Sequence, residues 1–217
     1  ASPVLDVQTR TRFNEANDSH YYLVPGVIVT IMTMIGALLT SLVMAREYER
    51  GTLESLFVTP VGSGEILTAK AATNFLLGMV SLAISMIFAA FVFDIPIRGS
   101  LILLLAVSAL FLIVALGLGL VISTATKNQF LACQFAIMGT FMPALMLSGF
   151  LYDILNMPPA VRAITYIIPA RYYVTLLQTL FLAGDIPSVI IPCCITLGVF
   201  AVVLMGIARL KAPKSLE

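Results

Sequence analysis

Five long apolar stretches divide this 217-residue chain, and none of them contains a charged residue. Each holds about 20 residues, enough for a helix that rises 1.5 Å per residue to cross a hydrocarbon layer of ~30 Å. An isolated strand could not satisfy its backbone polar groups in lipid, so the stretches are expected to be helices. The sequence therefore predicts an all-α membrane bundle with spans at residues 24–44, 71–93, 101–122, 130–148 and 188–208.

Composition supports the membrane class and argues against several others. Hydrophobic residues make up 60% of the chain and charged residues 11%, whereas soluble domains average about 45–50% and about 25%. A net charge of +1 provides no basic surface for nucleic acid. The single histidine and the three cysteines (Cys133, Cys193 and Cys194) do not have the spacing of a metal site. We expect neither a metal nor a cofactor on this chain.

The predicted spans lack the groups that intramembrane chemistry needs. They contain no His, Asp, Glu or Lys to activate a serine or threonine, so catalysis within the membrane is not expected. Ion-coupled transporters usually carry an ionisable residue inside the bundle, although backbone carbonyls can bind sodium and leave that alternative open. Asn74 and Gln134 are the strongest polar groups in the spans, and each is expected to form a hydrogen bond between helices. Energy for uphill transport would then come from another subunit.

Small residues recur at a spacing of four in three of the spans. Such stripes let helix backbones approach closely in lipid, where the hydrophobic effect does not drive association. The pattern predicts a compact bundle and not five independent anchors. The three stripes are Thr33/Ala37/Ser41, Ser81/Ser85/Ala89 and Ala115/Gly119/Ser123.

Residues 149–187 are too apolar for a solvated loop and too broken for a span. Pro158 and Pro159 can open a short helix that Pro169 ends, because proline suits a first turn and breaks a helix interior. A second helix is predicted over residues 170–183, with Gly184 as its C-cap. We expect two short helices that dip into one leaflet before the last span.

Lysine and arginine placement indicates the orientation. Five spans put the two ends of the chain on opposite sides of the membrane, and the more basic side is normally cytoplasmic. Residues 45–70 and the C-terminus are therefore expected in the cytoplasm. The more basic side carries Arg46, Arg50, Lys70, Lys127, Arg209, Lys211 and Lys214, and the other side carries Arg10, Arg12, Arg98, Arg162 and Arg171.

The charged linker 45–70 is the strongest candidate for a functional segment. Thr52 is a plausible N-cap for a short helix with Leu53, Leu56 and Phe57 on one face. Arg50 and Glu54 are spaced to pair along that segment. A helix that lies passively on lipid is the alternative, but the acids of the linker suit an anionic lipid surface poorly. A cytoplasmic protein partner fits them better.

This linker resembles the cytoplasmic signature of ABC-2 type permeases, the membrane subunits of bacterial ABC exporters. In that family the segment forms the coupling helix that docks on the ATPase subunit. The resemblance therefore implies an ATPase-coupling role for Arg46, Glu47, Glu49, Arg50, Gly51, Thr52, Leu53, Glu54, Leu56, Phe57 and Pro60.

Two further segments resemble the same family. Ser148-Gly149-Phe150 and the residues that follow it are similar to the family's extracytoplasmic re-entrant helices, and the matching positions are Pro158, Pro169, Arg171, Tyr172, Tyr173 and Gly184. Arg12-Phe13-Asn14 with Val24-Pro25-Gly26 is similar to the end of the large extracytoplasmic domain that some members have.

The resemblance implies an organisation and a function. Residues 1–23 would be the tail of an extracytoplasmic domain, 24–211 the transmembrane domain and 212–217 a cytoplasmic tail. Members normally have six spans, so this chain would be the C-terminal part of a longer permease. It would pair with a second copy or a paralogue in the bacterial inner membrane and bind a cytoplasmic ATPase subunit, which would carry the ATP and magnesium. A membrane scaffold that anchors a cytoplasmic partner without transport is the alternative.

Overall fold

In the computed structural model, the described part of the chain contains five helices long and apolar enough to cross a membrane. The structure describes residues 20–51, 63–95, 98–152 and 154–211, and these contain no strand. The five predicted spans are confirmed, with ends that shift by up to eight residues, the most at the start of the second span. The first comprises α1 (His20–Thr33), η1 (Met34–Leu39) and α2 (Thr40–Glu49); the others are α4 (Ser63–Phe91), α5 (Leu101–Thr126), α6 (Gln129–Ala136) with η2 (Ile137–Phe141) and α7 (Met142–Leu147), and α10 (Pro187–Lys211).

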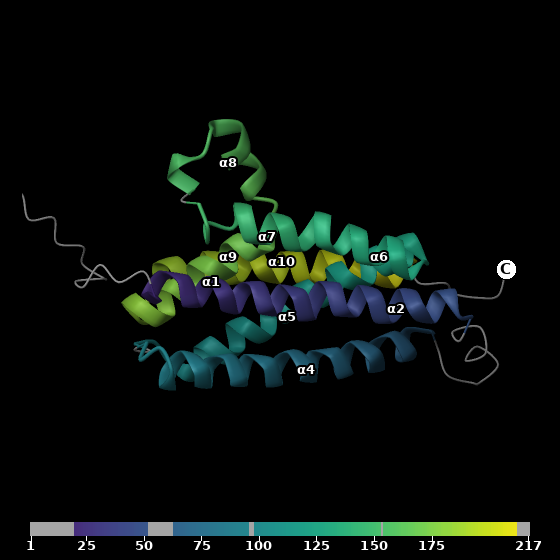
Figure 1. The fold of residues 1–217 in the computed structure, drawn as a ribbon, viewed down its shortest axis with the longest axis horizontal. Helices are drawn as coiled ribbons and strands as arrows, with labels where there is room; N and C mark the ends of the chain where they lie inside the picture. Colours follow the sequence, from purple (N-terminus) through teal and green to yellow (C-terminus); the bar gives the residue numbers. More distant parts are fainter. Residues whose placement is uncertain (1–19, 52–62, 96–97, 153, 212–217) are drawn as a thin grey trace, which may run out of the picture.

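Helix α5 lies at the centre of the bundle. It packs along α10 and along the first span, and it also contacts α4 and α6. The long helices run side by side along the long axis of the molecule, with α4 at one edge and α6 and α7 at the opposite edge (Figure 1). Half of α5 is buried, including Leu104, Phe111 and Leu112, while α4 and α10 expose rows of large apolar side chains. Such exposed rows suit contact with lipid.

Two of the small-residue stripes pack against each other, which agrees with the predicted compact bundle. A Cβ added at Gly119 would lie 2.6 Å from the carbonyl oxygen of Ala37, and one added at Gly36 would lie 2.4 Å from Cβ of Ala115. Nothing larger than glycine fits at these two crossings of α5 with the first span. The third stripe behaves differently, because Ser81 and Ser85 line a cavity between α4 and α1.

The two polar side chains predicted to join helices have different environments. The side-chain amide of Asn74 donates a hydrogen bond of 3.1 Å to the hydroxyl oxygen of Thr40, and both residues are buried. That prediction is confirmed. Gln134 lies exposed on α6, and among the described residues its side chain has no interhelical partner. The position faces outward because Ala132 and Ala136 carry the buried side of this helix.

Within residues 20–51, 63–95, 98–152 and 154–211, three helices contain a π-helical turn, a local insertion that often marks functional positions. η1 interrupts the first span and η2 the fourth, and the two turns contact each other. The third, η4 (Thr179–Ala183), ends the helix before the last span.

The segment between the fourth and fifth spans contains the two predicted short helices, α8 (Pro159–Thr165) and α9 (Pro169–Gln178), after a 3-10 turn, η3 (Ile154–Asn156). Pro158 precedes the first helix, and η4 extends the second as far as Gly184, whose φ of 89° makes it the expected C-cap. One detail differs from the prediction. Pro169 begins α9 and does not end α8, which stops at Thr165, because proline fits the first turn of a helix.

Candidate functional site

The predicted coupling segment begins where α2 ends. Arg46, Glu47 and Glu49 are still helical, Arg50 follows as the C-cap, and Gly51 has a φ of 66°. A left-handed conformation of this kind favours glycine and turns the chain out of the helix. The remaining coupling positions, Thr52, Leu53, Glu54, Leu56, Phe57 and Pro60, and the short helix predicted there, lie outside the described residues. They stay predictions.

The two acids at the end of α2 contact two other spans. The carboxylate of Glu47 lies 2.7 Å from the ammonium of Lys70 on α4, with side chains 25% and 28% exposed. The carboxylate of Glu49 accepts a hydrogen bond of 2.9 Å from the backbone N–H of Gln129, the first residue of α6. Arg46 and Arg50 are exposed. Glu49 is also exposed and Glu47 is half-buried, so both acids contact neighbouring spans but only Glu47 is partly covered by them.

Neither contact is predicted from the sequence, although one signal for the second is present. Asn128 is the N-cap of α6, and its side-chain oxygen accepts hydrogen bonds from the backbone N–H groups of Phe130 and Leu131 at 3.0 and 3.1 Å. An asparagine before an apolar run is typical of a helix start. A helix start attracts acids through its dipole, so an acid from another element was a reasonable candidate for this position.

The residues matched to re-entrant helices hold α8 and α9 in place. The guanidinium of Arg171 lies 3.9 Å from the centre of the Tyr166 ring and also donates a hydrogen bond to the hydroxyl of Thr165. The hydroxyl of Tyr172 donates to the carbonyl oxygen of Tyr166 at 2.9 Å. These contacts tie the start of α9 back to the end of α8.

Tyr173 connects α9 to the central helix. Its hydroxyl donates a 2.8 Å hydrogen bond to the hydroxyl oxygen of Ser108, and its ring stacks on Phe111 with centroids 4.1 Å apart. Tyr173 is fully buried, and this burial raises the pKa of its phenol well above the usual value, partly offset by the Ser108 hydrogen bond. The phenol therefore stays neutral and acts as a fixed donor inside the bundle.

A second set of contacts fastens the end of this segment to the start of α5. The backbone N–H of Gly99 donates to the carbonyl of Leu180 at 2.8 Å, and the N–H of Ser100 donates to the carboxylate of Asp185 at 2.9 Å. The Arg98 guanidinium donates to the carbonyl of Leu182 at 3.2 Å. The segment is thus held along α9 and again where η4 ends.

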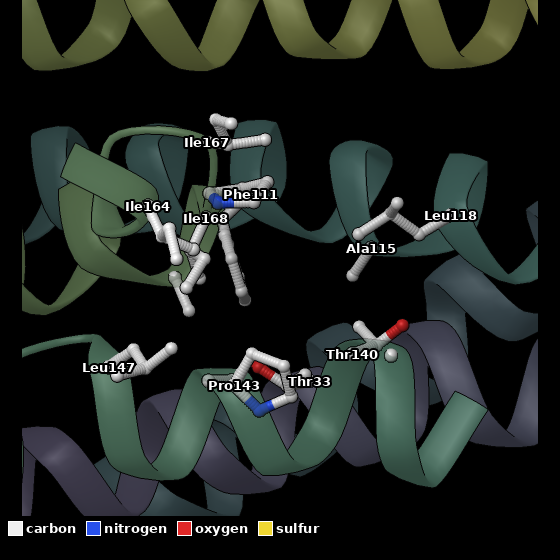
Figure 2. A pocket seen from close by; sticks show the side chains of 14 residues that line it. Thr33, Phe111, Ala115, Leu118, Thr140, Pro143, Leu147, Ile164, Ile167 and Ile168 are labelled. Carbon is white, nitrogen blue, oxygen red and sulfur yellow. The ribbon is translucent and has the colours of Figure 1, made fainter. Parts of the chain in front are cut away.

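An apolar cavity of about 350 Å³ lies between α5, the η2–α7 part of the fourth span and the α8–α9 segment. Figure 2 shows Ile164, Ile167 and Ile168 on one side and Leu147, Pro143 and Thr140 on the other. No charged residue lines it. The hydroxyl of Thr33 already donates to the carbonyl of Val29 at 2.7 Å, so Thr140 supplies the hydroxyl left for a ligand. Such a lining suits an uncharged, apolar molecule and not an ion.

A second cavity, of about 440 Å³, lies between α1 and α4. It is also apolar, apart from the hydroxyls of Ser81 and Ser85. Among the described residues no group of His, Cys, Asp and Glu has the arrangement of a metal site.

Comparison with known proteins identifies the family. The ABC-2 type transporter family model matches residues 5–182. The chain is 48% identical over 215 residues to the "Probable multidrug ABC transporter permease YbhS" of Escherichia coli, which covers 99% of this chain and 57% of that protein. It is 31% identical over 180 residues to the "Probable multidrug ABC transporter permease YbhR" of the same organism, covering 82% of this chain and 48% of that protein.

A more distant relative covers the whole chain. This is the "Inner membrane transport permease YhhJ" of Escherichia coli, 28% identical over 217 residues, which are 58% of that protein. The chain thus spans about half the length of these relatives. The family match includes the first four spans and the segment that leads to the fifth, and the first relative extends the likeness across the fifth. The chain belongs to the ABC-2 type transporter family.

Proposed function

We propose that this chain forms the membrane part of a permease subunit in an ATP-driven exporter of the bacterial inner membrane. The observation that carries the proposal is the 48% identity, over 99% of the chain, to a protein named as a probable multidrug ABC transporter permease. Residues 24–211 would be the transmembrane domain, 1–23 the tail of an extracytoplasmic domain and 212–217 a cytoplasmic tail. The subunit would work with a second copy or a paralogue.

The chain itself would not be an enzyme. A cytoplasmic ATPase subunit would bind residues 46–60 and would carry the ATP and magnesium. α2 ends on the same side of the bundle as α10 (Figure 1), which finishes with Arg209 and Lys211 in its last turn, and basic residues at a span end favour the cytoplasmic side. α8 and α9 would then lie toward the extracytoplasmic side, dipping into that leaflet.

The cavity beside α7 would be a site for cargo. Its lining offers apolar contact and one available hydroxyl, so the cargo class would be uncharged, apolar molecules. The cavity is lined by η2 and α7 of the fourth span and by the α8–α9 segment. A relative movement of these two elements would open or close the cavity.

Purified permease and ATPase, reconstituted in vesicles, test the proposal. We expect the ATPase to bind wild-type permease, and we expect apolar cargo to stimulate ATP hydrolysis. Leu56→Asp should weaken binding by roughly a hundredfold, since losing the burial of one leucine costs up to about 3 kcal/mol. Binding without any cargo stimulation would support the scaffold alternative, and no binding of an ATPase would refute the proposal.

A further inference from the structure

The turn between α8 and α9 forms one wall of the cavity beside α7 and has little packing behind it. Ile164, Ile167 and Ile168, here called the isoleucine wall, line the cavity from this turn. Ile164 is nevertheless 54% exposed and Ile167 71% exposed. α9 packs along α1, α5 and α10, whereas α8 projects from the side of the bundle (Figure 1). The position of the isoleucine wall therefore depends on contacts within the α8–α9 segment.

Arg171 supplies two of these contacts. Its guanidinium lies 3.9 Å from the centre of the Tyr166 ring, which is within the range of a cation–π interaction, and it also donates a hydrogen bond to the hydroxyl of Thr165. Both partners stand between Ile164 and Ile167 in the chain. Among the described residues Arg171 forms no ion pair with an acid, so the aromatic ring takes the place of a carboxylate.

The helix that carries Arg171 is fixed inside the bundle. Arg171 lies in the first turn of α9, and Ala170, Tyr173 and Leu177 of the same helix are buried. The hydroxyl of Tyr173 donates to Ser108 on the central helix. The guanidinium thus reaches from a buried helix back to the less covered isoleucine wall.

We propose that Arg171 is a positioning residue that holds the isoleucine wall through Tyr166 and so sets the affinity of the cavity for cargo. The inference deepens the proposed function and rests on it, because it takes the cavity beside α7 as the cargo site. Neither Arg171 nor Tyr166 lines this cavity. Arg171 therefore acts through the turn and not by touching the cargo.

Variants of the permease, reconstituted with its ATPase in vesicles, test this role. Arg171→Gln removes the cation, Tyr166→Leu removes the ring, and Tyr166→Phe keeps the ring without its hydroxyl. The double variant Arg171→Gln/Tyr166→Leu measures whether the two residues act together. Arg98→Gln is the matched control, because it removes an arginine from the same end of the bundle whose partner, Leu182, does not line the cavity.

Each variant is titrated with Nile red, an uncharged apolar dye, as the probe cargo. The titration gives the maximal stimulation of ATP hydrolysis and the dye concentration at half of it. Amide hydrogen exchange over residues 164–168 is measured in parallel on the permease alone, so this measurement needs neither ATPase nor cargo.

We expect Arg171→Gln and Tyr166→Leu each to raise the half-maximal concentration about two- to fivefold, the range for one partly exposed cation–π contact. Maximal stimulation should stay unchanged, because saturating cargo still fills the cavity, and exchange over residues 164–168 should become faster. The double variant should shift the titration no further than either single variant. Tyr166→Phe and Arg98→Gln should match the wild type.

Several results would overturn the inference. Additive shifts in the double variant, or a shift in Tyr166→Phe equal to that in Tyr166→Leu, would mean that the ring is not the partner of the cation. Lower maximal stimulation with an unchanged half-maximal concentration would indicate a general structural role, as would an equal shift in Arg98→Gln. Wild-type permease that Nile red does not stimulate would refute the proposed cargo class, and the exchange data would then report only whether Arg171 fixes the turn.

Discussion

At the scale of single residues, Tyr173 does two things at once. Its hydroxyl joins α9 to Ser108 on the central helix, and its ring supports Phe111, which lines the cavity. Ser108 in turn donates to the carbonyl of Leu104 at 2.8 Å, so the hydroxyl of Ser108 is used both as donor and as acceptor. A short buried chain of hydrogen bonds therefore sets the position of α9 relative to α5.

Tyr173→Phe should lower the stability of the bundle modestly. It removes the hydroxyl and keeps the ring stack, so the expected cost is about 0.5–1.5 kcal/mol for one buried hydrogen bond. Tyr173→Ala also removes the ring and leaves a cavity, for which about 3–5 kcal/mol is typical of large aromatic residues. Thermal unfolding in detergent measures both. Tyr152→Phe is the control, because Tyr152 is 61% exposed.

The raised pKa of Tyr173 also predicts how the stability difference between wild type and Tyr173→Phe depends on pH. Burial holds the folded-state pKa above its unfolded value, so the contribution of the neutral phenol is fully present below the unfolded pKa and is lost only at higher pH. The difference between wild type and Tyr173→Phe should therefore stay constant from neutral to mildly alkaline pH. A difference that disappeared near neutral pH would contradict the buried placement of the phenol.

At the scale of elements, the sequence predicts those spans and helix ends that depend on residues close together in the chain. The spans follow from uncharged apolar runs. The start of α8 follows from Pro158 and the end of η4 from Gly184, because proline suits a helix start and glycine adopts the positive φ that ends a helix. The contact of Glu49 with Gln129 joins residues 80 positions apart, and no periodic pattern in the sequence predicts it. The π-helical turns and the cavity also escape prediction, since they depend on how several helices pack together.

Gly139 on η2 lines the cavity beside α7, and a substitution there tests whether this cavity binds cargo. A Cβ added there meets no atom within 4 Å, so Gly139→Leu should fit into the cavity and occupy part of it without unfolding the bundle. We expect cargo-stimulated ATP hydrolysis to need about tenfold more cargo, equivalent to ~1.4 kcal/mol of lost binding. The measurement is a cargo titration in vesicles.

Gly198→Leu provides the matched control for this prediction. Gly198 lies on α10, and an added Cβ there also meets nothing within 4 Å, but the residue does not line the cavity. Its cargo titration should match the wild type. If both leucine variants shifted the titration equally, the shift would result from the changed helix propensity and not from filling of the cavity.

At the scale of the whole molecule, the five spans separate two unlike ends. One end of the bundle holds the C-terminal ends of α2 and α10, with the basic residues Arg46, Arg50, Arg209 and Lys211. The other end holds the hydrogen bonds between residues 98–100 and residues 180–185. At the first end the carboxylates of Glu47 and Glu49 contact neighbouring spans, and at the second end backbone N–H and carbonyl groups make most of the contacts.

This arrangement predicts the orientation, which cysteine labelling in intact cells can measure. The background replaces Cys133, Cys193 and Cys194 with alanine, because all three thiols are free and partly exposed. In that background Tyr152→Cys should react with a membrane-impermeant thiol reagent, and Arg50→Cys should react only after the membrane is permeabilised. The basis is the excess of Lys and Arg at the Arg50 end. Labelling of Arg50→Cys in intact cells, with Tyr152→Cys protected, would reverse the orientation and would put the linker out of reach of a cytoplasmic ATPase.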